Sequence, residues 1–335
     1  MKSLQTYFFA VSVTPARFDP AINSEFRGTK TMSKHFAFLI GNADPVFDQL
    51  AAIATRNGFD VRRTPDTMHI EAPLGLVEVK ANAQGTQIAF SANTPPELQL
   101  LKDLYAQRFE KLGLDAGIRW SAPNAQYPLN QTLCNVVSSR QISPNFQRVR
   151  LSGDFGDFAV TGAGLHFRFL LGPEGAHWPT LDQHGLTHWP DGAKAWHRPP
   201  YSVRKLSSNA DWMDVDIVLH AGGRVTEWCT TVQAGDQIAI HGPSGSKQPG
   251  AKHLALCGDE TALPVILHMI ENAPPDSIGH AIIMVRDMND AQPVDCSANV
   301  HIDWTTSTNL EPTQDALKTL EYPTADTHFF FAGER

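Results

Sequence analysis

The sequence predicts three folded parts: a small α+β domain, a six-stranded antiparallel β-barrel and a parallel-sheet α/β domain. The length of 335 residues exceeds the roughly 250 residues that one hydrophobic core usually supports. Between residues 132 and 241, short strand-like runs recur with turn residues between them. After residue 251 strands alternate with helices, a pattern typical of a parallel sheet.

The α+β domain is expected over residues 32–115, after an N-terminal extension of residues 1–31. Residues 45–57 carry apolar side chains at helical spacing, and Asp44 before Pro45 suits a helix start. Three alternating runs follow, at residues 67–71, 76–80 and 86–91. A second helix, opening at residues 93–97, carries an apolar stripe as far as Leu112. Periodicity is lost over residues 116–130, where we expect a linker.

The barrel is expected over residues 131–249, with one helix at residues 225–232. Its six strands are predicted at residues 132–138, 146–152, 166–171, 201–206, 213–220 and 237–241. The α/β domain is expected over residues 250–335, with ligands at the carboxyl ends of its strands. Its strands are predicted at residues 253–257, 281–285 and 327–331, and its helices at residues 262–271 and 310–320.

Composition excludes several classes of protein. The net charge of −8 gives no broad positive field for nucleic acid or an anionic membrane, and no apolar run approaches the roughly 18–20 residues of a membrane span. The four cysteines form no C-x-x-C pair, which fits free thiols in a reducing compartment, so we expect a cytoplasmic protein. We also expect a monomer. No metal site is expected from the irregularly spaced histidines of one loop, His177, His184, His188 and His197.

The run Arg-Pro-Pro-Tyr-Ser-Val-Arg, starting at Arg198, is the segment most informative about function. Tyr201 offers an aromatic face, Ser202 a hydroxyl, and Arg198 and Arg204 two guanidinium groups. A flavin needs a flat ring to lean against, a hydrogen-bond partner near its N5 and donors for its phosphates. The same residues also fit an ordinary strand, with Tyr201 and Val203 facing a core.

A second segment, from His220 to Trp228, ends a strand in two glycines and begins a helix. Glycine lets the backbone approach a ligand closely, and the first-turn amides of a helix bind anions, so a pyrophosphate fits here. A plain strand-to-helix turn, with Thr226 helping to cap the helix, fits equally well.

A third segment, Cys-Gly-Asp-Glu-Thr from residue 257, follows the first α/β strand. The pyrophosphate of a nicotinamide cofactor would lie there, although G-x-G-x-x-G is absent. After the second strand, Arg286 favours a 2′-phosphate and Asp287 a free 2′-hydroxyl, so NADPH and NADH both stay open.

Taken in order, these segments resemble the siderophore-interacting proteins, FAD-dependent ferric-siderophore reductases of the ferredoxin reductase superfamily. The family pattern appears as Tyr-Ser-Val-Arg (201–204), Gly-Arg-Val-Thr-Glu-Trp (223–228), Gly-Asp (235–236), Gly-Pro (242–243), Gly-Asp-Glu-Thr-Ala-Leu-Pro (258–264) and Ala-Gly-Glu (332–334). The resemblance covers roughly residues 130–335. Residues 33–112 also look like a small domain of unknown function that accompanies these reductases.

The resemblance implies FAD in the barrel, with Tyr201 against the isoalloxazine ring, Ser202 near N5 and Arg204 toward the phosphates. The amides of Val225 and Thr226 are implied to face the pyrophosphate, and NADPH or NADH to deliver hydride from the α/β side. Tyr201 and Ser202 are the implied catalytic residues. The expected cofactor-binding set is Arg198, Tyr201, Ser202, Val203, Arg204, His220, Gly223, Val225, Thr226, Trp228, Gly258, Asp259, Glu260, Thr261 and Arg286.

Two features depart from the family pattern. The superfamily usually has arginine two positions before the tyrosine, where this chain has Pro199 and places Arg198 one residue farther away. Relatives also continue beyond Ala-Gly-Glu, so we expect the α/β domain to be shortened.

The expected function is therefore NAD(P)H-dependent reduction of Fe(III) in a ferric siderophore to Fe(II), by way of FAD. Two alternatives stay open at this point: a general flavin or quinone reductase, and a noncatalytic siderophore- or iron-binding protein.

Overall fold

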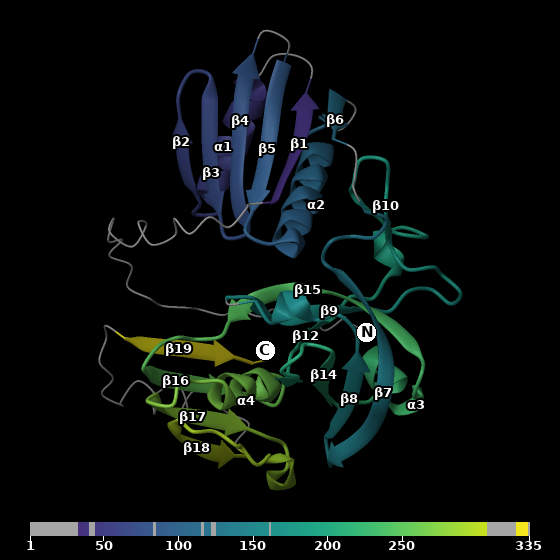
Figure 1. Ribbon diagram of the computed structural model, residues 1–335, viewed down its shortest axis with the longest axis vertical. Coiled ribbons are helices and arrows are strands. Elements are labelled where there is room, and N and C mark those ends of the chain that lie inside the picture. The colour runs from purple at the N-terminus through teal and green to yellow at the C-terminus, as the bar shows by residue number, and fades with distance from the viewer. Residues whose placement is uncertain are drawn as a thin grey trace. The chain divides into compact units, whose positions relative to one another are not determined.

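The structure is a computed structural model that describes residues 33–39, 44–82, 85–114, 117–121, 125–160, 162–306 and 326–333 (Figure 1). The predicted N-terminal extension, the predicted helix at residues 310–320 and Glu334 lie outside these residues. The described chain forms two compact units. Within the described residues, one unit joins Thr132–Leu171 to the chain from His197 onward, and the other joins residues 33–131 to Gly172–Trp196. None of the described helices is long and apolar enough to cross a bilayer.

The first unit in sequence is built on a six-stranded sheet of order β2-β3-β4-β5-β1-β6. Its elements are β1 (Ser33–Leu39), α1 (Asp44–Arg56), β2 (Asp60–Arg63), β3 (Thr67–Ala72), β4 (Gly75–Asn82), β5 (Gly85–Ala92), α2 (Pro95–Lys111) and β6 (Ile118–Trp120). Alternate residues of β3, β4 and β5, such as Ile70, Val77 and Phe90, are fully buried and share one core with apolar residues of both helices. The sheet therefore buries one face under α1 and α2.

Residues 116–130 are not wholly a linker. Ile118–Trp120 forms β6, which pairs with the end of β1, and the Trp120 ring stacks on Phe90 with 5.7 Å between centroids. A three-residue edge strand is too short to show periodicity, so the sequence pattern could not predict it.

The segment Gly172–Trp196 interrupts the barrel sequence and packs with the α+β domain. It contains the hairpin of β10 (Thr180–Leu181) and β11 (Thr187–His188). The Asp103 carboxylate in α2 accepts hydrogen bonds from the Thr187 amide (3.0 Å) and hydroxyl (2.6 Å), and the Lys102 ammonium donates to the Gly185 carbonyl (2.7 Å). The predicted barrel range of residues 131–249 thus includes an insertion, Gly172–Trp196, that is hydrogen-bonded to α2.

The barrel sheet has the strand order β12-β9-β15-β7-β8-β14-β13. Its strands are β7 (Gln131–Ser143), β8 (Phe146–Ser152), β9 (Gly164–Leu170), β12 (Pro200–Ser202), β13 (Lys205–Leu206), β14 (Trp212–Val218) and β15 (Gln237–Lys247), with α3 (Arg224–Thr231) between the last two. The predicted fourth strand is split into β12 and β13, which lie at opposite edges of this sheet. Because only Val203 and Arg204 join them, the sheet must curl until its edges meet, which makes the predicted six-stranded barrel.

The α/β domain is a parallel sheet of order β18-β17-β16-β19, with α4 (Leu263–Glu271) packed on one face. Its strands are β16 (His253–Gly258), β17 (Ile278–Met284), β18 (Asn299–Thr305) and β19 (Thr327–Ala332). The sequence pattern does not predict β18. This strand follows an irregular segment after β17 and alternates exposed and half-buried residues instead of forming an apolar run.

Candidate functional site

The predicted tyrosine-serine and double-glycine segments meet at Phe169 of β9. The Tyr201 ring of β12 lies 5.0 Å from the Phe169 ring between centroids, and the Trp228 ring of α3 lies 5.1 Å from it. Phe169 itself is fully buried in the barrel core. Two segments more than twenty residues apart are therefore held against one side chain.

Ser202 lies in a buried pair with His166 of β9. The Ser202 hydroxyl and the Nδ1 atom of His166 are 3.0 Å apart, and the two residues are 4% and 8% exposed. Burial lowers the pKa of His166 to about 4, so the imidazole is neutral at neutral pH. His166 was not among the residues predicted from the sequence. Its signal is the strand register, which pairs Ser202 with His166 and is not visible in the sequence alone.

The double-glycine bend leads directly into α3. Gly222 has a φ of +73°, in the region that favours glycine, and a Cβ on Gly223 would lie 2.5 Å from the His220 ring. The His220 amide donates to the Thr226 hydroxyl at 3.3 Å, which closes the bend. The Val225 side chain is buried in the barrel core, so α3 is fixed at its first turn, where the amides of a helix have no intrahelical acceptor.

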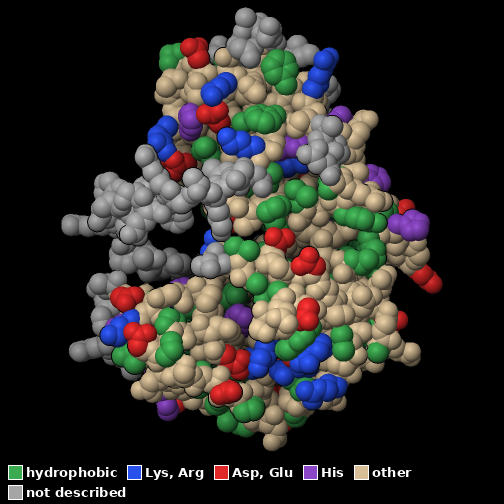
Figure 2. Space-filling model, in the orientation of Figure 1, with side chains coloured by type: hydrophobic (Ala, Val, Ile, Leu, Met, Phe, Trp, Pro, Cys, Tyr) green, Lys and Arg blue, Asp and Glu red, His purple; other side chains and the backbone are tan. Residues whose placement is uncertain are grey.

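His197 and Arg198, just before β12, each lie near another basic side chain. Burial and then the charge of Arg168 lower the pKa of Arg198, and burial and then the charge of Arg224 lower the pKa of His197. One Arg168 guanidinium NH group donates to the Arg198 carbonyl at 2.8 Å. An anion bound beside Arg168 and Arg198 would reduce the mutual repulsion of these two guanidinium groups. Over the visible face, by contrast, Lys and Arg side chains lie beside Asp and Glu side chains (Figure 2).

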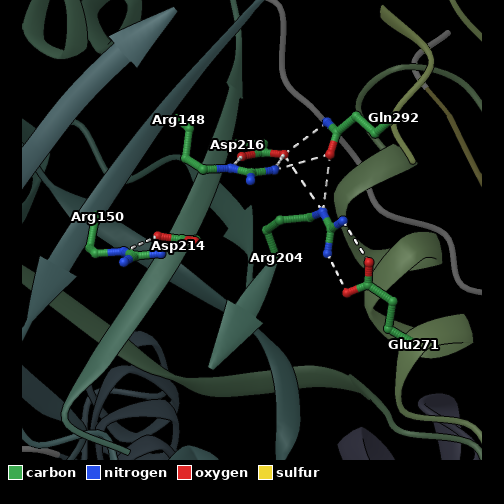
Figure 3. Close-up of polar contacts among 7 residues, drawn as sticks. All are labelled: Arg148, Arg150, Arg204, Asp214, Asp216, Glu271 and Gln292. Carbon is green, nitrogen blue, oxygen red and sulfur yellow. Dashed lines mark hydrogen bonds and ion pairs between the residues drawn. The ribbon is translucent and has the colours of Figure 1, made fainter. Parts of the chain in front are cut away.

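Arg204 joins the barrel to the α/β domain (Figure 3). Its guanidinium donates to both carboxylate oxygens of Glu271 in α4, at 2.7 and 2.8 Å, and lies 3.7 Å from Asp216 of β14. Gln292 bridges the group, because its amide oxygen accepts from Arg204 (3.3 Å) and Arg148 (3.0 Å). Arg148 completes the network with a two-bond ion pair to Asp216, at 2.6 and 2.7 Å.

Arg204 and Val203 of the expected cofactor-binding set are buried in the barrel wall. The phosphate role expected for Arg204 does not match this geometry, because the residue is 5% exposed and its guanidinium is turned toward Glu271 and Asp216. Val203 is 2% exposed in the barrel core, and its amide donates to the Leu165 carbonyl at 2.9 Å. Both residues form structural contacts in the barrel wall.

The turn after β16 is tightly closed. A Cβ on Gly258 would lie 2.5 Å from the Ala262 side chain and 2.7 Å from the Ala332 carbonyl oxygen, so only glycine fits. The Asp259 carboxylate accepts from the amide and the hydroxyl of Thr261, at 2.8 and 2.6 Å. This acid shapes the turn that leads into α4, whose first turn lies at the carboxyl end of β16.

Arg286 lies beside the same turn. Its guanidinium donates to the Glu260 carboxylate at 2.5 Å and to the Leu219 carbonyl at 3.3 Å. Leu219 directly precedes the His220 bend, so Arg286 connects the two predicted nucleotide-facing turns. Its contact with a 2′-phosphate stays a prediction.

Two family models match the second part of the chain. The siderophore-interacting FAD-binding domain matches residues 135–247, and the siderophore-interacting protein model matches residues 251–335. The chain belongs to the siderophore-interacting protein family.

Known proteins agree with this assignment. Ferric vibriobactin reductase ViuB of Vibrio cholerae is 26% identical over 182 residues, which are 51% of this chain and 65% of that protein. The NADPH-dependent ferric-chelate reductase of Escherichia coli is 28% identical over 164 residues, which are 45% of this chain and 62% of that protein. The chain spans 40% of the length of mycobacterial relatives that it matches at 36% identity.

Solved structures support the fold. The siderophore-interacting protein SipS from Aeromonas hydrophila is 27% identical, with a TM-score of 0.50 over 63% of this chain and 81% of that chain. A siderophore utilization protein from T. fusca is 29% identical, with the same TM-score of 0.50 over 62% of this chain and 82% of that chain. The barrel followed by a parallel α/β sheet is therefore the fold expected for this siderophore-interacting protein.

We predict that replacing Arg204 loosens the attachment of α4 to the barrel. Arg204→Met leaves the Glu271 carboxylate at a part-buried site without its two-bond partner, a loss that typically costs about 3–5 kcal/mol for a buried pair. Amide hydrogen exchange measured by mass spectrometry should become faster in α4. Arg150→Met is the matched control, because Arg150 pairs with Asp214 inside the barrel sheet. Equal exchange of α4 in both variants would contradict the prediction.

We also predict a pH dependence of stability from His166. Below pH 6.5 unfolding lets this imidazole take up a proton, whereas the folded form stays neutral down to its pKa of about 4. The free energy of unfolding therefore falls as the pH falls between these values. Between pH 7.5 and 5.0, urea denaturation of the wild type should lose about 2 kcal/mol more than that of His166→Asn. His188→Asn, at an exposed position, should behave like the wild type, and an unchanged pH dependence in His166→Asn would refute the assignment.

Proposed function

We propose that this siderophore-interacting protein binds FAD in its barrel and passes electrons from NADPH or NADH to Fe(III) held by a siderophore. The observation that carries the proposal is the convergence of Tyr201 and Trp228 on Phe169. Two relatives bear names that describe ferric vibriobactin and ferric-chelate reduction. The siderophore substrate and the hydride donor of this chain are parts of the proposal.

The residues present fit FAD. The flavin ring would lie against the half-buried Tyr201 side chain. The buried Phe169 ring packs against Tyr201 and holds it in place. The pyrophosphate would accept hydrogen bonds from the first-turn amides of α3. Arg198 and Arg224 supply positive charge, since Arg198 contributes to the lowered pKa of His241 and Arg224 to that of His197. The site thus offers an aromatic contact for the flavin ring and hydrogen-bond donors and positive charge for the pyrophosphate.

FAD, when bound, supplies the ability to accept two electrons as hydride and to release them one at a time, which suits one-electron reduction of iron. Tyr201 would orient the ring, because Phe169 limits the directions that the tyrosine side chain can take. The amides of Val225 and Thr226 would hold the pyrophosphate. Iron stays with the siderophore as substrate, so the protein needs no iron ligand of its own in this reaction.

His166 is proposed as the residue that sets the direction of the Ser202 hydroxyl. A neutral imidazole either accepts from this hydroxyl at Nδ1 or donates to it, according to its tautomer. With Nδ1 unprotonated, Ser202 donates to His166 and leaves its oxygen lone pairs toward the site. With Nδ1 protonated, Ser202 instead becomes a donor to the site. The pair could in this way hold or supply a proton at the Ser202 oxygen.

The nicotinamide side is proposed at the carboxyl end of β16, near Gly258 and the start of α4. The network around Arg204 would keep this domain at a fixed position relative to the barrel, since α4 is bonded to it through Glu271. Fixed positions matter because hydride transfer requires donor and acceptor atoms within about 3–3.5 Å.

Purified protein tests this proposal directly. After reconstitution with FAD it should be yellow, lose its colour when NADPH or NADH is added without oxygen, and regain it when a ferric siderophore is added, with Fe(II) captured by a coloured chelator. Tyr201→Ala should lower FAD affinity roughly tenfold or more, as removal of a stacking ring does. Tyr127→Ala is the control, because Tyr127 is 50% exposed.

Other outcomes separate the alternatives. Turnover of quinones at a far higher rate than ferric siderophores would favour a general flavin or quinone reductase. Siderophore binding without oxidation of NADPH or NADH would indicate a noncatalytic binding protein. A protein that stays colourless after attempted reconstitution would refute the proposed function.

A further inference from the structure

Two neighbouring strands of the α/β sheet bring two imidazoles and a carboxylate together. His280 lies in β17 and is paired in register with His301 of β18, while Asp303 follows two residues later in β18. Residues two apart on a strand point to the same face, so His301 and Asp303 share a face. Ala281 and Ile283, which alternate with His280, are buried in the core with α4. The three polar side chains therefore project from the face opposite α4.

The three side chains also converge in space. Their potential ligand atoms all lie within 4.8 Å of one another. The Nε2 atom of His280 lies 2.6 Å from one Asp303 carboxylate oxygen, and the Nε2 atom of His301 lies 3.0 Å from the other. Both histidines thus direct the same ring nitrogen toward one carboxylate. Among the residues that the structure describes, only this group of three or more His, Cys, Asp or Glu converges so closely.

The scaffold and the exposure suit a metal site that is open to water. The side chains of His280, Asp303 and His301 are 21%, 53% and 72% exposed. Their backbones are fixed by parallel pairing that runs the whole length of β17 and β18. A bound metal would lie about 2.0–2.2 Å from each donor atom. The three side chains would have to rotate slightly to open this space, while the backbone could stay in place.

We propose that His280, His301 and Asp303 form a three-ligand site for a divalent first-row transition metal, with water in the remaining positions. Two imidazole nitrogens and one carboxylate oxygen are a donor set typical of Zn²⁺, Co²⁺ and Fe²⁺. The proposal does not rest on the flavin function. It differs from the sequence analysis, which expected no metal site, because His280 and His301 belong to different strands and are adjacent only through the pairing of β17 with β18.

Titration of the metal-free, full-length protein with Co²⁺ tests the proposal, followed by displacement with Zn²⁺. The wild type should bind one Co²⁺ tightly, with visible absorption bands that disappear as Zn²⁺ replaces it. His280→Gln, His301→Gln and Asp303→Asn should each weaken binding by more than the roughly 10–100-fold that loss of an outer-shell partner costs. Circular dichroism should show that each variant is folded, since these side chains are partly exposed.

The control separates this site from weak binding by the other histidines of the chain. His253 lies on β16, on the same sheet, and His253→Gln should bind Co²⁺ as the wild type does. Two results would overturn the proposal: a His280→Gln/His301→Gln double variant that binds as much Co²⁺ as the wild type, or an equal loss of binding in His253→Gln. In either case the three residues form only a hydrogen-bonded cluster.

Discussion

The packing of two aromatic side chains on Phe169 fixes the geometry on which the proposed site depends. Tyr201 reaches this ring from β12 and Trp228 reaches it from α3, so a strand and a helix separated along the chain are held together. Burial of large aromatic side chains contributes strongly to stability. Tyr201 and the first turn of α3, which we propose hold the flavin ring and its pyrophosphate, are therefore positioned by the barrel core.

The polar contacts extend this order to the second domain. Arg204 is next to Val203, a core residue, and two residues from Ser202, yet its guanidinium reaches Glu271 in α4. A buried charge that lost its partner would be costly, so the network resists separation of the two domains. A short segment of chain thus combines the core packing of Val203, the buried Ser202 hydroxyl and the ion pair of Arg204 with the α/β domain.

The sequence was sufficient for the features that depend on local patterns. Apolar periodicity predicted α1 and α2, and strand-like runs predicted most of the barrel. The order of short motifs identified the family. What it could not predict depends on pairing between distant segments. The role of His166 follows from its register with Ser202, and the grouping of His280 with His301 follows from the pairing of β17 with β18.

Arg204 is a residue for which the sequence-based prediction was made but does not match the contacts in the structure. A guanidinium near a proposed phosphate site fits an anion contact from the sequence alone, but its partner Glu271 is 67 residues away and belongs to another domain. The insertion Gly172–Trp196 is similar, because its attachment to α2 runs through Asp103 and Thr187. In both cases the deciding contact is long-range, and no window of sequence contains both partners.

A crystal structure of the protein grown with FAD would show where the flavin binds. We expect the isoalloxazine ring against Tyr201 and the pyrophosphate at the first turn of α3, with Tyr201 and Trp228 still packed on Phe169. Electron density that places the flavin elsewhere, or that shows Tyr201 and Trp228 apart from Phe169, would contradict this expectation.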